Sequence, residues 1–507
     1  MKKGRVFLNI FSNWMFFVLA ILIAFIVSPI MVKKLGNETY GIWVLMVSIS
    51  SYFTVLDFGI NTALVRFISK YTTLKNYQKA AQIYSASFIF FLIFGVIVIV
   101  SSMLLGRVFR DFFGIETLSE RYIYFVFVMI GVDLAINLTF SVLSGTLRGL
   151  GRFLEINIIL SLTAILKNTI LVYLLMSNYS ILSLAMLQAS FSILSYLAQY
   201  LYIRKKYAFL KFRFSYVNRA TFRQLFNYSI YSFLIAFALK VLFYTDSVVI
   251  GSMVTLEGVT YYAIPAMIVE NLEKFIWAIV AVLIPIISSQ EAVGNIQDMG
   301  THYIIGTKYS LLLCAPVIVV LSIVGDDFIG LWIGETYAKP SGDVLNILLI
   351  GYVFALGQLI AQGILKGISK HRVLAYILCM EAIGNLLLSV LLAPKYGING
   401  VAIGTTVPLL IANIVLIPYF TCRELNLDFY SYLLKGILLP IFPIFLLFLV
   451  LDNMNISAVS YFEVVVFSFF ITLLIGIYSI FFQLEKDHRD GIFLKAKMVV
   501  GGIGIMR

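Results

Sequence analysis

The stretch Ala80–Gly106, AAQIYSASFIFFLIFGVIVIVSSMLLG, decides the fold class. It contains no charged side chain and exceeds the roughly 20 residues that a helix needs to cross a hydrocarbon core of about 30 Å. It also lacks the period-2 alternation of an outer-membrane barrel strand, so its backbone hydrogen bonds are expected to close within a helix. The stretch therefore predicts a transmembrane helix.

Stretches of this kind recur from one end of the chain to the other. Further examples are Val6–Val32, Tyr309–Gly325, Val344–Leu365, Tyr396–Cys422 and Val464–Leu484. Hydrophobic residues make up 61% of the chain and charged residues 12%, with a mean hydropathy of +0.99, a balance that excludes a soluble globular domain of this length. The apolar windows and their polar breaks predict an all-α polytopic membrane protein with about fourteen transmembrane helices.

Basic residues indicate how these helices are oriented. Lys2, Lys3 and Arg5 precede the first apolar run, which is too long for a secretion signal and lacks an Ala-x-Ala cleavage site, so we expect a retained first helix. With the N-terminus in the cytoplasm, most of the 37 Lys and Arg residues fall in cytoplasmic segments, as the positive-inside rule requires. Both termini are therefore predicted to be cytoplasmic. The net charge of +12 reflects this topology and does not indicate nucleic acid.

The sequence contains no pattern for a metal or a cofactor. Cys314, Cys379 and Cys422 are isolated in or beside apolar segments, and there is no C-x-x-C pair. No Walker loop occurs, so ATP is not expected to be a direct energy source. We predict neither a metal site nor a cofactor.

An internal repeat divides the chain. The segment Gly145–Arg152 (GTLRGLGR) matches Gly363–Lys370 (GILKGISK) in its glycines and basic residues, at an offset of 218. Leu35–Tyr40 similarly resembles Leu256–Tyr261 at an offset of 221. Two matches at nearly one offset, at equivalent points between apolar stretches, indicate two copies of one helical lobe in the same orientation.

The repeat predicts four parts in the chain. An N-terminal six-helix lobe is expected over residues 1–203, and a pseudo-symmetric second six-helix lobe over 225–422. A basic cytoplasmic linker at 204–224 joins them, because the densest run of Lys and Arg lies there. Residues 423–507 are expected to add two transmembrane helices and a cytoplasmic tail. Two such lobes would enclose a central cavity that can open to either side.

The chain resembles a known family through several short motifs. These are Leu35-Gly36 followed by Tyr40-Gly41-Ile42-Trp43, Leu56-Asp57-Phe58-Gly59-Ile60 with Arg66 beyond it, Gly145-x-x-Arg148-Gly149, Asp246 followed by Ile250-Gly251, and Tyr396-Gly397-Ile398-x-Gly400-Val401-Ala402. Over essentially its whole length it is similar to the polysaccharide-transport branch of the multidrug/oligosaccharidyl-lipid/polysaccharide (MOP) exporter superfamily, which contains the Wzx-type flippases of O-antigen and capsule repeat units.

This resemblance implies a MATE-like fold and a function. The family's activity is translocation of an undecaprenyl-diphosphate-linked oligosaccharide from the inner to the outer leaflet of the bacterial cytoplasmic (inner) membrane, by alternating access and driven by an ion gradient. The implied partners are that glycan lipid, membrane lipids, and the glycan polymerase and chain-length machinery, with no nucleic acid. A lipid II flippase and an ion-coupled drug exporter of the same superfamily remain alternatives.

An enzyme is the more distant alternative. A membrane glycan polymerase or acyltransferase would be expected to carry a large extracytoplasmic loop or a histidine inside the membrane. The predicted outside loops are short, and His302, His371 and His488 all fall in predicted cytoplasmic segments. We therefore expect a transporter rather than an enzyme.

Charged residues within apolar stretches are the candidate substrate-binding groups, since a charge in a membrane helix needs a partner, a wet cavity or a role. Lys167 and Lys240 lie deep in predicted helices and could hold a diphosphate as point charges. The alternative is an internal ion pair, for which Lys240 has Asp246 nearby. Arg66, beyond the cytoplasmic end of the second predicted helix, could meet a headgroup.

Acidic residues in apolar surroundings are candidates for ion coupling or gating. Asp133 and Glu381 could bind and release a proton during a transport cycle, or could be buried hydrogen-bonded acids. Asp57 could cap a helix at the membrane face, and Asp246 belongs to the family motif. Glu270 and Lys274 are four residues apart and so share a helix face; they form either a structural pair or a gate.

Three prolines are hinge candidates. Pro29, Pro265 and Pro285 lie in or beside predicted transmembrane helices, where a proline kinks the helix and frees a carbonyl group. They could serve alternating access or could be ordinary membrane-helix prolines.

Overall fold

A computed structural model describes residues 3–293, 296–368, 370–485 and 489–490. These residues form helices joined by short turns and contain no strand. Twelve helical stretches within the described residues are long and apolar enough to cross a membrane. The prediction of an all-α polytopic membrane protein is confirmed, and the expected count of about fourteen passes holds approximately.

One of the twelve stretches contains a tight hairpin. Helix α12 (His371–Leu410) breaks at Gly397, whose φ of 58° and ψ of −138° favour glycine. Nδ2 of Asn385 lies 2.8 Å from Oγ1 of Thr405, twenty residues further on, whereas the two would be about 30 Å apart on one straight helix. The chain therefore turns back at Gly397, and α12 supplies parts of two membrane passes.

The membrane helix that begins at Asn37 ends at Asp57, within the motif Leu56-Asp57-Phe58-Gly59-Ile60. Helix α2 (Asn37–Ser51) continues as the 3-10 helix η1 (Tyr52–Asp57) and stops where Phe58 and Gly59 both take left-handed backbone angles. A separate helix, α3 (Ile60–Thr73), then begins. The Asp57 carboxylate accepts a hydrogen bond from the Asn61 N–H at 3.0 Å, so it satisfies a backbone N–H in the first turn of α3, whose N-cap residue is Gly59.

Contacts divide the chain into two compact units. Unit 1 comprises Met1–Ile264 and His371–Pro408, and unit 2 comprises Pro265–Lys370 and Leu409–Arg507. The six-helix lobes and the linker drawn from the sequence repeat stay predictions.

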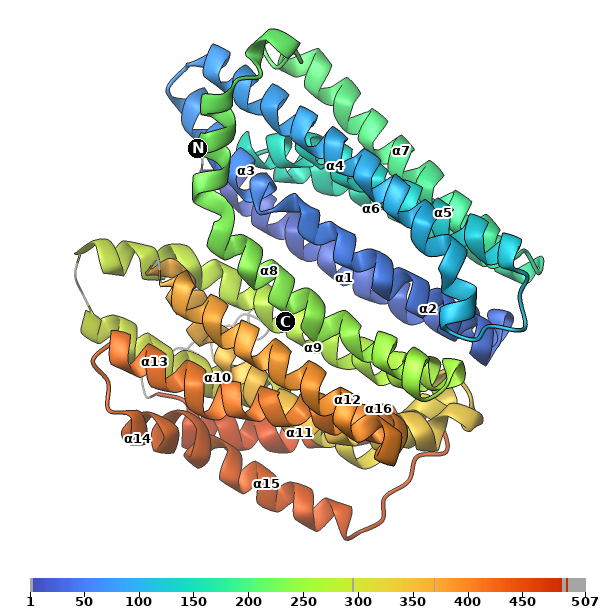
Figure 1. Ribbon diagram of the computed structural model, residues 1–507. Coiled ribbons are helices and arrows are strands. Elements are labelled where there is room, and N and C mark those ends of the chain that lie inside the picture. Colours follow the sequence, from blue (N-terminus) through green and yellow to red (C-terminus); the bar gives the residue numbers. More distant parts are fainter. Residues whose placement is uncertain (1–2, 294–295, 369, 486–488, 491–507) are drawn as a thin grey trace, which may run out of the picture. The chain divides into compact units, whose positions relative to one another are not determined.

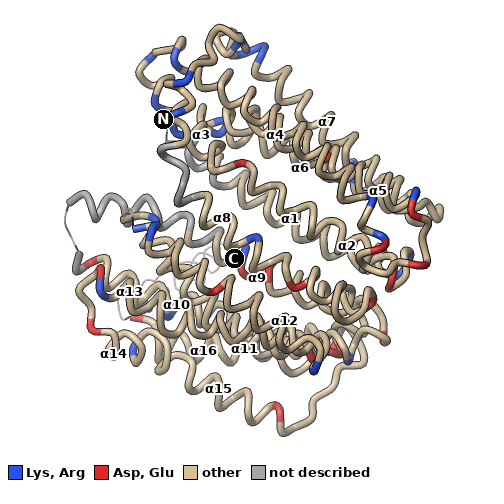
Figure 2. The backbone as a smooth tube through the Cα atoms, in the orientation of Figure 1, with Lys and Arg blue, Asp and Glu red and all other residues tan. Residues whose placement is uncertain are grey.

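Unit 1 is a bundle whose long helices share one direction in Figure 1. Its elements besides α2, η1, α3 and most of α12 are α1 (Lys3–Leu35), α4 (Tyr77–Phe112), α5 (Glu120–Gly149), α6 (Phe153–Met176), α7 (Ile181–Lys206), η2 (Phe214–Tyr216), α8 (Arg219–Met253) and the first turns of α9 (Leu256–Val293). Figure 2 shows that Lys and Arg of this unit gather mainly near the ends of its helices, as expected for membrane-crossing elements.

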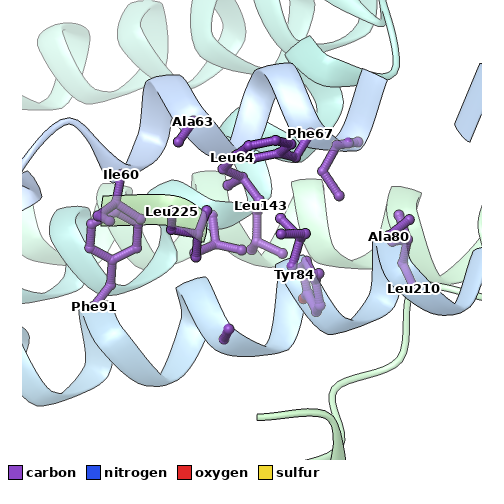
Figure 3. Close-up of a cluster of buried hydrophobic side chains, with 14 of the residues drawn as sticks. Ile60, Ala63, Leu64, Phe67, Ala80, Tyr84, Phe91, Leu143, Leu210 and Leu225 are labelled. Atoms are coloured by element: carbon purple, nitrogen blue, oxygen red, sulfur yellow. The ribbon is translucent and has the colours of Figure 1, made fainter. Parts of the chain in front are cut away.

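A hydrophobic core joins the helices of unit 1 near one end. Ile60 and Leu64 of α3, Phe91 of α4, Leu143 of α5 and Leu225 of α8 are all buried in it (Figure 3). Glycines let the helices approach closely: a Cβ on Gly41 of α2 would lie 2.2 Å from the backbone oxygen of Leu256. The bundle is therefore fixed by interior packing, while the aliphatic outer faces of α1, α4, α6 and α7 are exposed and suit a lipid environment.

Unit 2 is built around α10 and α11. It contains the rest of α9, α10 (Ile296–Trp332), α11 (Glu335–Gly367), the π-helix η3 (Ile411–Leu416), α13 (Ile417–Glu424), α14 (Phe429–Tyr432), η4 (Leu433–Leu438), α15 (Leu439–Asp452), α16 (Tyr461–Tyr478) and η5 (Ser479–Gln483). The two C-terminal membrane helices pack on α10, where Leu312, Val320, Ile444 and Ile471 are buried together.

A neutral polar cluster lies inside unit 2. The hydroxyl group of Tyr303 in α10 donates to Oε1 of Gln358 in α11 at 2.9 Å, and Nε2 of Gln358 donates to the Tyr432 hydroxyl at 2.8 Å. The two tyrosine rings stack with centroids 4.3 Å apart, and all three side chains are fully buried. This cluster ties α14, which leads into the C-terminal helices, to α10 and α11.

The substitution Gln358→Leu is expected to destabilise unit 2. It removes two buried hydrogen bonds, one from the Tyr303 hydroxyl and one to the Tyr432 hydroxyl, each worth about 0.5–1.5 kcal/mol. Thermal unfolding of the purified protein in detergent measures this as a lowered transition temperature. Tyr303→Phe removes one of these two bonds by itself, so the double variant should lose less stability than the sum of the single variants. An unchanged transition in Gln358→Leu would contradict this account.

Candidate functional site

A buried carboxylate in unit 1 is the most completely built polar site among the described residues. Asp246 lies in α8 with 3% of its surface exposed. Its oxygens accept hydrogen bonds from the Tyr262 hydroxyl at 2.5 Å, the Thr405 hydroxyl at 2.8 Å, Asn385 Nδ2 at 3.3 Å and the Ser389 hydroxyl at 3.5 Å. All four donors are neutral, so a full negative charge here would be held by hydrogen bonds alone, an expensive arrangement in a membrane protein.

The α12 hairpin creates this site. Asn385 and Ser389 are four residues apart on its first helix, and Val401 and Thr405 are four apart on its second, so each pair shares a helix face. A Cβ on Gly404 would lie 2.5 Å from the backbone nitrogen of Ser389. Glycine at 404 therefore allows the two helices to approach until their polar faces meet around Asp246.

The cluster offers a set of oxygen atoms suited to a small cation. The Val401 carbonyl oxygen lies 3.4 Å from the Ser389 hydroxyl oxygen and 3.2 Å from the Thr405 hydroxyl oxygen, so this carbonyl adjoins the carboxylate. Oδ1 of Asn385 is buried and has no hydrogen-bond partner. Hard cations take carboxylate, carbonyl and hydroxyl oxygens as ligands. Because the cluster has a single carboxylate, a monovalent ion or a proton would neutralise it, whereas a divalent ion would leave uncompensated charge.

Sequence reasoning found Asp246 but missed its partners. Tyr262, Asn385, Ser389 and Thr405 were not among the candidates. A signal for them is present: Asn385 and Ser389 precede Tyr396-Gly397, and Thr405 follows it, as polar residues on otherwise apolar helices. Reading the glycine as a helix reversal would have paired the two faces.

Lys167 and Asp133, two sequence candidates, meet in a second polar site within unit 1. The Lys167 ammonium in α6 donates to Oε1 of Gln188 in α7 at 3.3 Å, and the Gln188 side chain also bonds to Asp133 of α5. Asp133 further accepts from the Ser192 hydroxyl at 2.6 Å and from Asn137 Nδ2 at 3.0 Å. Lys167, Gln188, Asn137 and Ser192 line a cavity of about 260 Å³.

The other candidate cations of unit 1 lie elsewhere. Lys240 in α8 is half-buried, and its ammonium group lies 4.8 Å from the centre of the Tyr244 ring, a cation–π contact. Asp246, which the sequence offered as its ion-pair partner, is bonded instead to the neutral groups above. Arg66 in α3 is exposed.

Two further acidic candidates occupy different surroundings. Glu381 is buried in the first helix of α12. It lies four residues before Asn385 and therefore on the same helix face as the Asp246 cluster. Asp57 lines a cavity of about 220 Å³ with Asn61 and Asn137 in unit 1.

A charged cluster lies in unit 2. Glu270 and Lys274 of α9 form the expected ion pair, with a carboxylate oxygen 2.9 Å from the ammonium nitrogen. Glu273, also in α9, is hydrogen-bonded to the side chain of Trp277, one helical turn further along. The Lys366 ammonium of α11 lies 4.0 Å from the centre of the Trp277 ring. Pairing is thus shown for Glu270 and Lys274, and a gating role stays a prediction.

The hinge candidates are inside helices. Pro29 lies in α1. Pro265 is buried in α9, where unit 1 ends and unit 2 begins. Pro285 also falls within α9, but its side chain lies outside the described residues.

The chain is similar in sequence to known membrane proteins. The chain is 24% identical over 413 residues to the "Putative O-antigen transporter" of Shigella flexneri, and the match covers 80% of this chain and 96% of that protein. It is 27% identical over 292 residues to an uncharacterized membrane protein of Methanocaldococcus jannaschii, covering 55% of this chain and 57% of that protein.

Solved structures of two membrane transport proteins share the fold. An inward-facing multidrug resistance MATE family transporter of the MOP superfamily superposes with a TM-score of 0.70 at 15% identity, covering 81% of this chain and 94% of that one. The lipid II flippase MurJ in an inward closed conformation superposes with a TM-score of 0.70 at 14% identity, covering 94% of this chain and 99% of that one. The model of the family described as polysaccharide biosynthesis protein matches residues 6–291. The expectation from the sequence motifs is thereby confirmed at the level of family and fold: this chain has a MATE- and MurJ-like fold and belongs to the polysaccharide biosynthesis protein family.

Proposed function

We propose that this protein is a flippase that carries an undecaprenyl-diphosphate-linked oligosaccharide from the inner to the outer leaflet of the bacterial cytoplasmic membrane. Membership in the polysaccharide biosynthesis family and the similarity to the Shigella flexneri protein support the glycan as cargo. A multi-pass helical fold shared with a MATE transporter and with MurJ supports alternating access over enzymatic chemistry. Both termini are proposed to lie in the cytoplasm, which the positive-inside rule supports, and a glycan polymerase with its chain-length machinery is the proposed recipient of the product.

The second part of this proposal is that transport is coupled to a cation gradient through the buried Asp246 cluster. A monovalent cation enters the cluster and is held by the Asp246 carboxylate, Asn385 Oδ1, the hydroxyl groups of Ser389 and Thr405, and the Val401 carbonyl. The observation that supports this is the buried, unpartnered Asn385 Oδ1 beside a carboxylate that has only neutral partners. Sodium fits this ligand set, and a proton on Asp246 is the other outcome that the experiments distinguish.

Anion binding is assigned to cations of unit 1. Lys167, Lys240 and Arg66 are proposed to hold the diphosphate at successive stages of transport, and Pro29, Pro265 and Pro285 to bend during the change of access. Of these three cations, Lys167 has the most structural support as a diphosphate-binding residue, because it lines a cavity together with several polar side chains. The Glu270–Lys274 pair is proposed to open and close as a gate.

A deletion strain tests the substrate and the direction together. Cells lacking the gene are expected to accumulate lipid-linked oligosaccharide on the cytoplasmic leaflet, because synthesis continues while translocation stops. Extraction of the lipid, identification of its glycan, and protection of that glycan from an added periplasmic or external glycosidase provide the measurement. Accumulation of lipid II instead would assign a different cargo, and full exposure of the glycan to the glycosidase would contradict the flippase proposal.

A further inference from the structure

The segment that follows α7 is fixed to the surface of unit 1. Its Leu210 is buried in the core beside Ala80 and Tyr84 of α4 (Figure 3). The backbone N–H of Arg213 donates to Oγ of the buried Ser85 at 3.2 Å. The segment is thus held by α4 along its length and does not behave as a free linker.

Side chains of this segment alternate between the core and the outside. Leu210 is buried and the Phe212 ring lies 5.3 Å from the Phe88 ring of α4, whereas Lys211 and Arg213 are exposed. This is the period-2 pattern of an extended chain with one buried face. The two cations are therefore presented side by side on a fixed backbone.

Lys211 and Arg213 line a basic hollow at this end of unit 1. The hollow has a volume of about 370 Å³ and is also lined by Tyr77 and Gln78 of α4 and by Tyr216. The Arg213 guanidinium lies 5.5 Å from the centre of the Tyr216 ring. This volume lies within the range of about 300–1,000 Å³ typical of small-molecule sites.

The two chain segments that form the basic hollow are rich in basic residues and contain no acidic ones. Residues 58–110 and 156–245, which include both segments that form it, contain no Asp or Glu. The further basic residues of the adjoining helix ends are Lys70, Lys75, Lys79, Arg204, Lys205, Lys206, Arg219 and Arg223. An anion at Lys211 and Arg213 would therefore meet no nearby carboxylate from these segments.

A second, apolar hollow lies further along α4. It has a volume of about 350 Å³ and is lined by Tyr84, Phe88, Phe140, Leu197 and Phe212, among others. Residues 77 and 81 line the basic hollow, and 84 and 88 line the apolar one. These four positions share one face of α4 because they follow the i, i+4, i+7, i+11 spacing. The two hollows therefore follow one another along this face of α4, and together they are called the groove, with a cationic end and an aromatic end.

The geometry points to a binding site for an anionic phospholipid, with its phosphate at Lys211 and Arg213 and one acyl chain in the apolar hollow. Charge complementarity selects a phosphate. The apolar hollow further along α4 selects a lipid over a soluble phosphate compound. A phospholipid is the occupant because the surrounding bilayer supplies it continuously at helix ends, where basic clusters attract anionic headgroups. The site is separate from the Asp246 cluster and does not depend on the proposed cargo.

A pair of matched double variants tests the site. Lys211→Gln with Arg213→Gln removes both groove cations, and Lys205→Gln with Arg219→Gln removes two exposed cations from the same basic region outside the groove. The purified full-length protein is delipidated in non-ionic detergent and titrated with phosphatidylglycerol, with phosphatidylcholine, with glycerol 3-phosphate and with undecaprenyl diphosphate. Retained lipid is counted by native mass spectrometry, and thermal unfolding confirms that every variant is folded.

The wild type and the control variant are expected to bind one phosphatidylglycerol tightly and with equal affinity. The groove variant should bind it about 25-fold more weakly, at roughly fivefold for each charge lost near a membrane surface. Equal weakening in both double variants would show a diffuse charge effect and overturn the site, as would no weakening in either. Tighter binding of glycerol 3-phosphate or of undecaprenyl diphosphate than of phosphatidylglycerol would overturn the choice of occupant.

Discussion

Replacing Asp246 by Asn is expected to abolish cation-coupled glycan export while the protein still reaches the membrane. Asn keeps the size of the side chain and can accept from Tyr262 and Thr405, so the packing of α8 against the α12 hairpin should survive. What it removes is the single negative charge that a bound cation requires. Breaking a buried charge pair costs about 3–5 kcal/mol, which weakens cation binding by more than roughly 100-fold.

Two measurements separate this effect from simple misfolding. Sodium should raise the unfolding temperature of the purified wild type more than potassium does, because a ligand that binds only the folded state stabilises it, and Asp246→Asn should lose this difference. Ser389→Ala, which removes the most distant of the four donors at 3.5 Å, is the mild control and should retain part of it. Export by Asp246→Asn at the wild-type level would remove the cluster from the coupling mechanism. Loss of export without any sodium effect in the wild type would indicate a proton instead.

Replacing Lys167 by Ala should also abolish export at an unchanged protein level in the membrane. The ammonium group is the only cation among the described residues that line its cavity, so its loss leaves no positive charge there for a diphosphate. The same loss also removes the positive charge that interacts with Asp133. Glycan at the cell surface, measured against membrane abundance of the variant, reports the outcome.

Double substitution distinguishes the two roles of Lys167. If the ammonium group serves only to balance Asp133, Lys167→Met combined with Asp133→Asn should restore export, since both charges disappear together. If it holds the diphosphate, the double variant stays inactive, and this is the expected result. Lys167→Arg, which keeps the charge, should retain partial export. Restored export in the double variant, or near-normal export in Lys167→Ala, would remove Lys167 from the substrate site.

The fold could be predicted from sequence because hydrocarbon imposes a length and a composition on every pass. An uncharged stretch such as Ala80–Gly106 has no other stable arrangement than a helix, and α4 covers it. The positions at which helices break were harder to predict from the sequence. The end of η1 at Phe58 and Gly59 depends on left-handed backbone angles and on the hydrogen bond from the Asn61 N–H to Asp57, and nothing in the hydropathy of that stretch distinguishes it from a continuing helix.

The candidate site was predictable only in part, for a physical reason. A lone charge in an apolar helix, such as Asp246 or Lys167, is conspicuous because its burial is costly. Its neutral hydrogen-bond partners are not conspicuous in the sequence, because Ser, Thr, Asn and Tyr occur throughout membrane helices at little energetic cost. Asn385 and Thr405 meet only because the chain reverses at Gly397, which brings together residues twenty positions apart. Such a contact forms in the folded chain, and the spacing of polar residues in the sequence indicates it only weakly.

The reversal at Gly397 has a consequence for biogenesis. A turn of this tightness leaves no hydrophilic loop between the two helices of α12, so neither helix can settle in the bilayer while the other waits outside. Entering alone, each would also present Asn385 and Ser389, or Thr405, to acyl chains. We therefore expect residues 371–410 to enter the membrane together as a helical hairpin, with the polar faces of its two helices already paired.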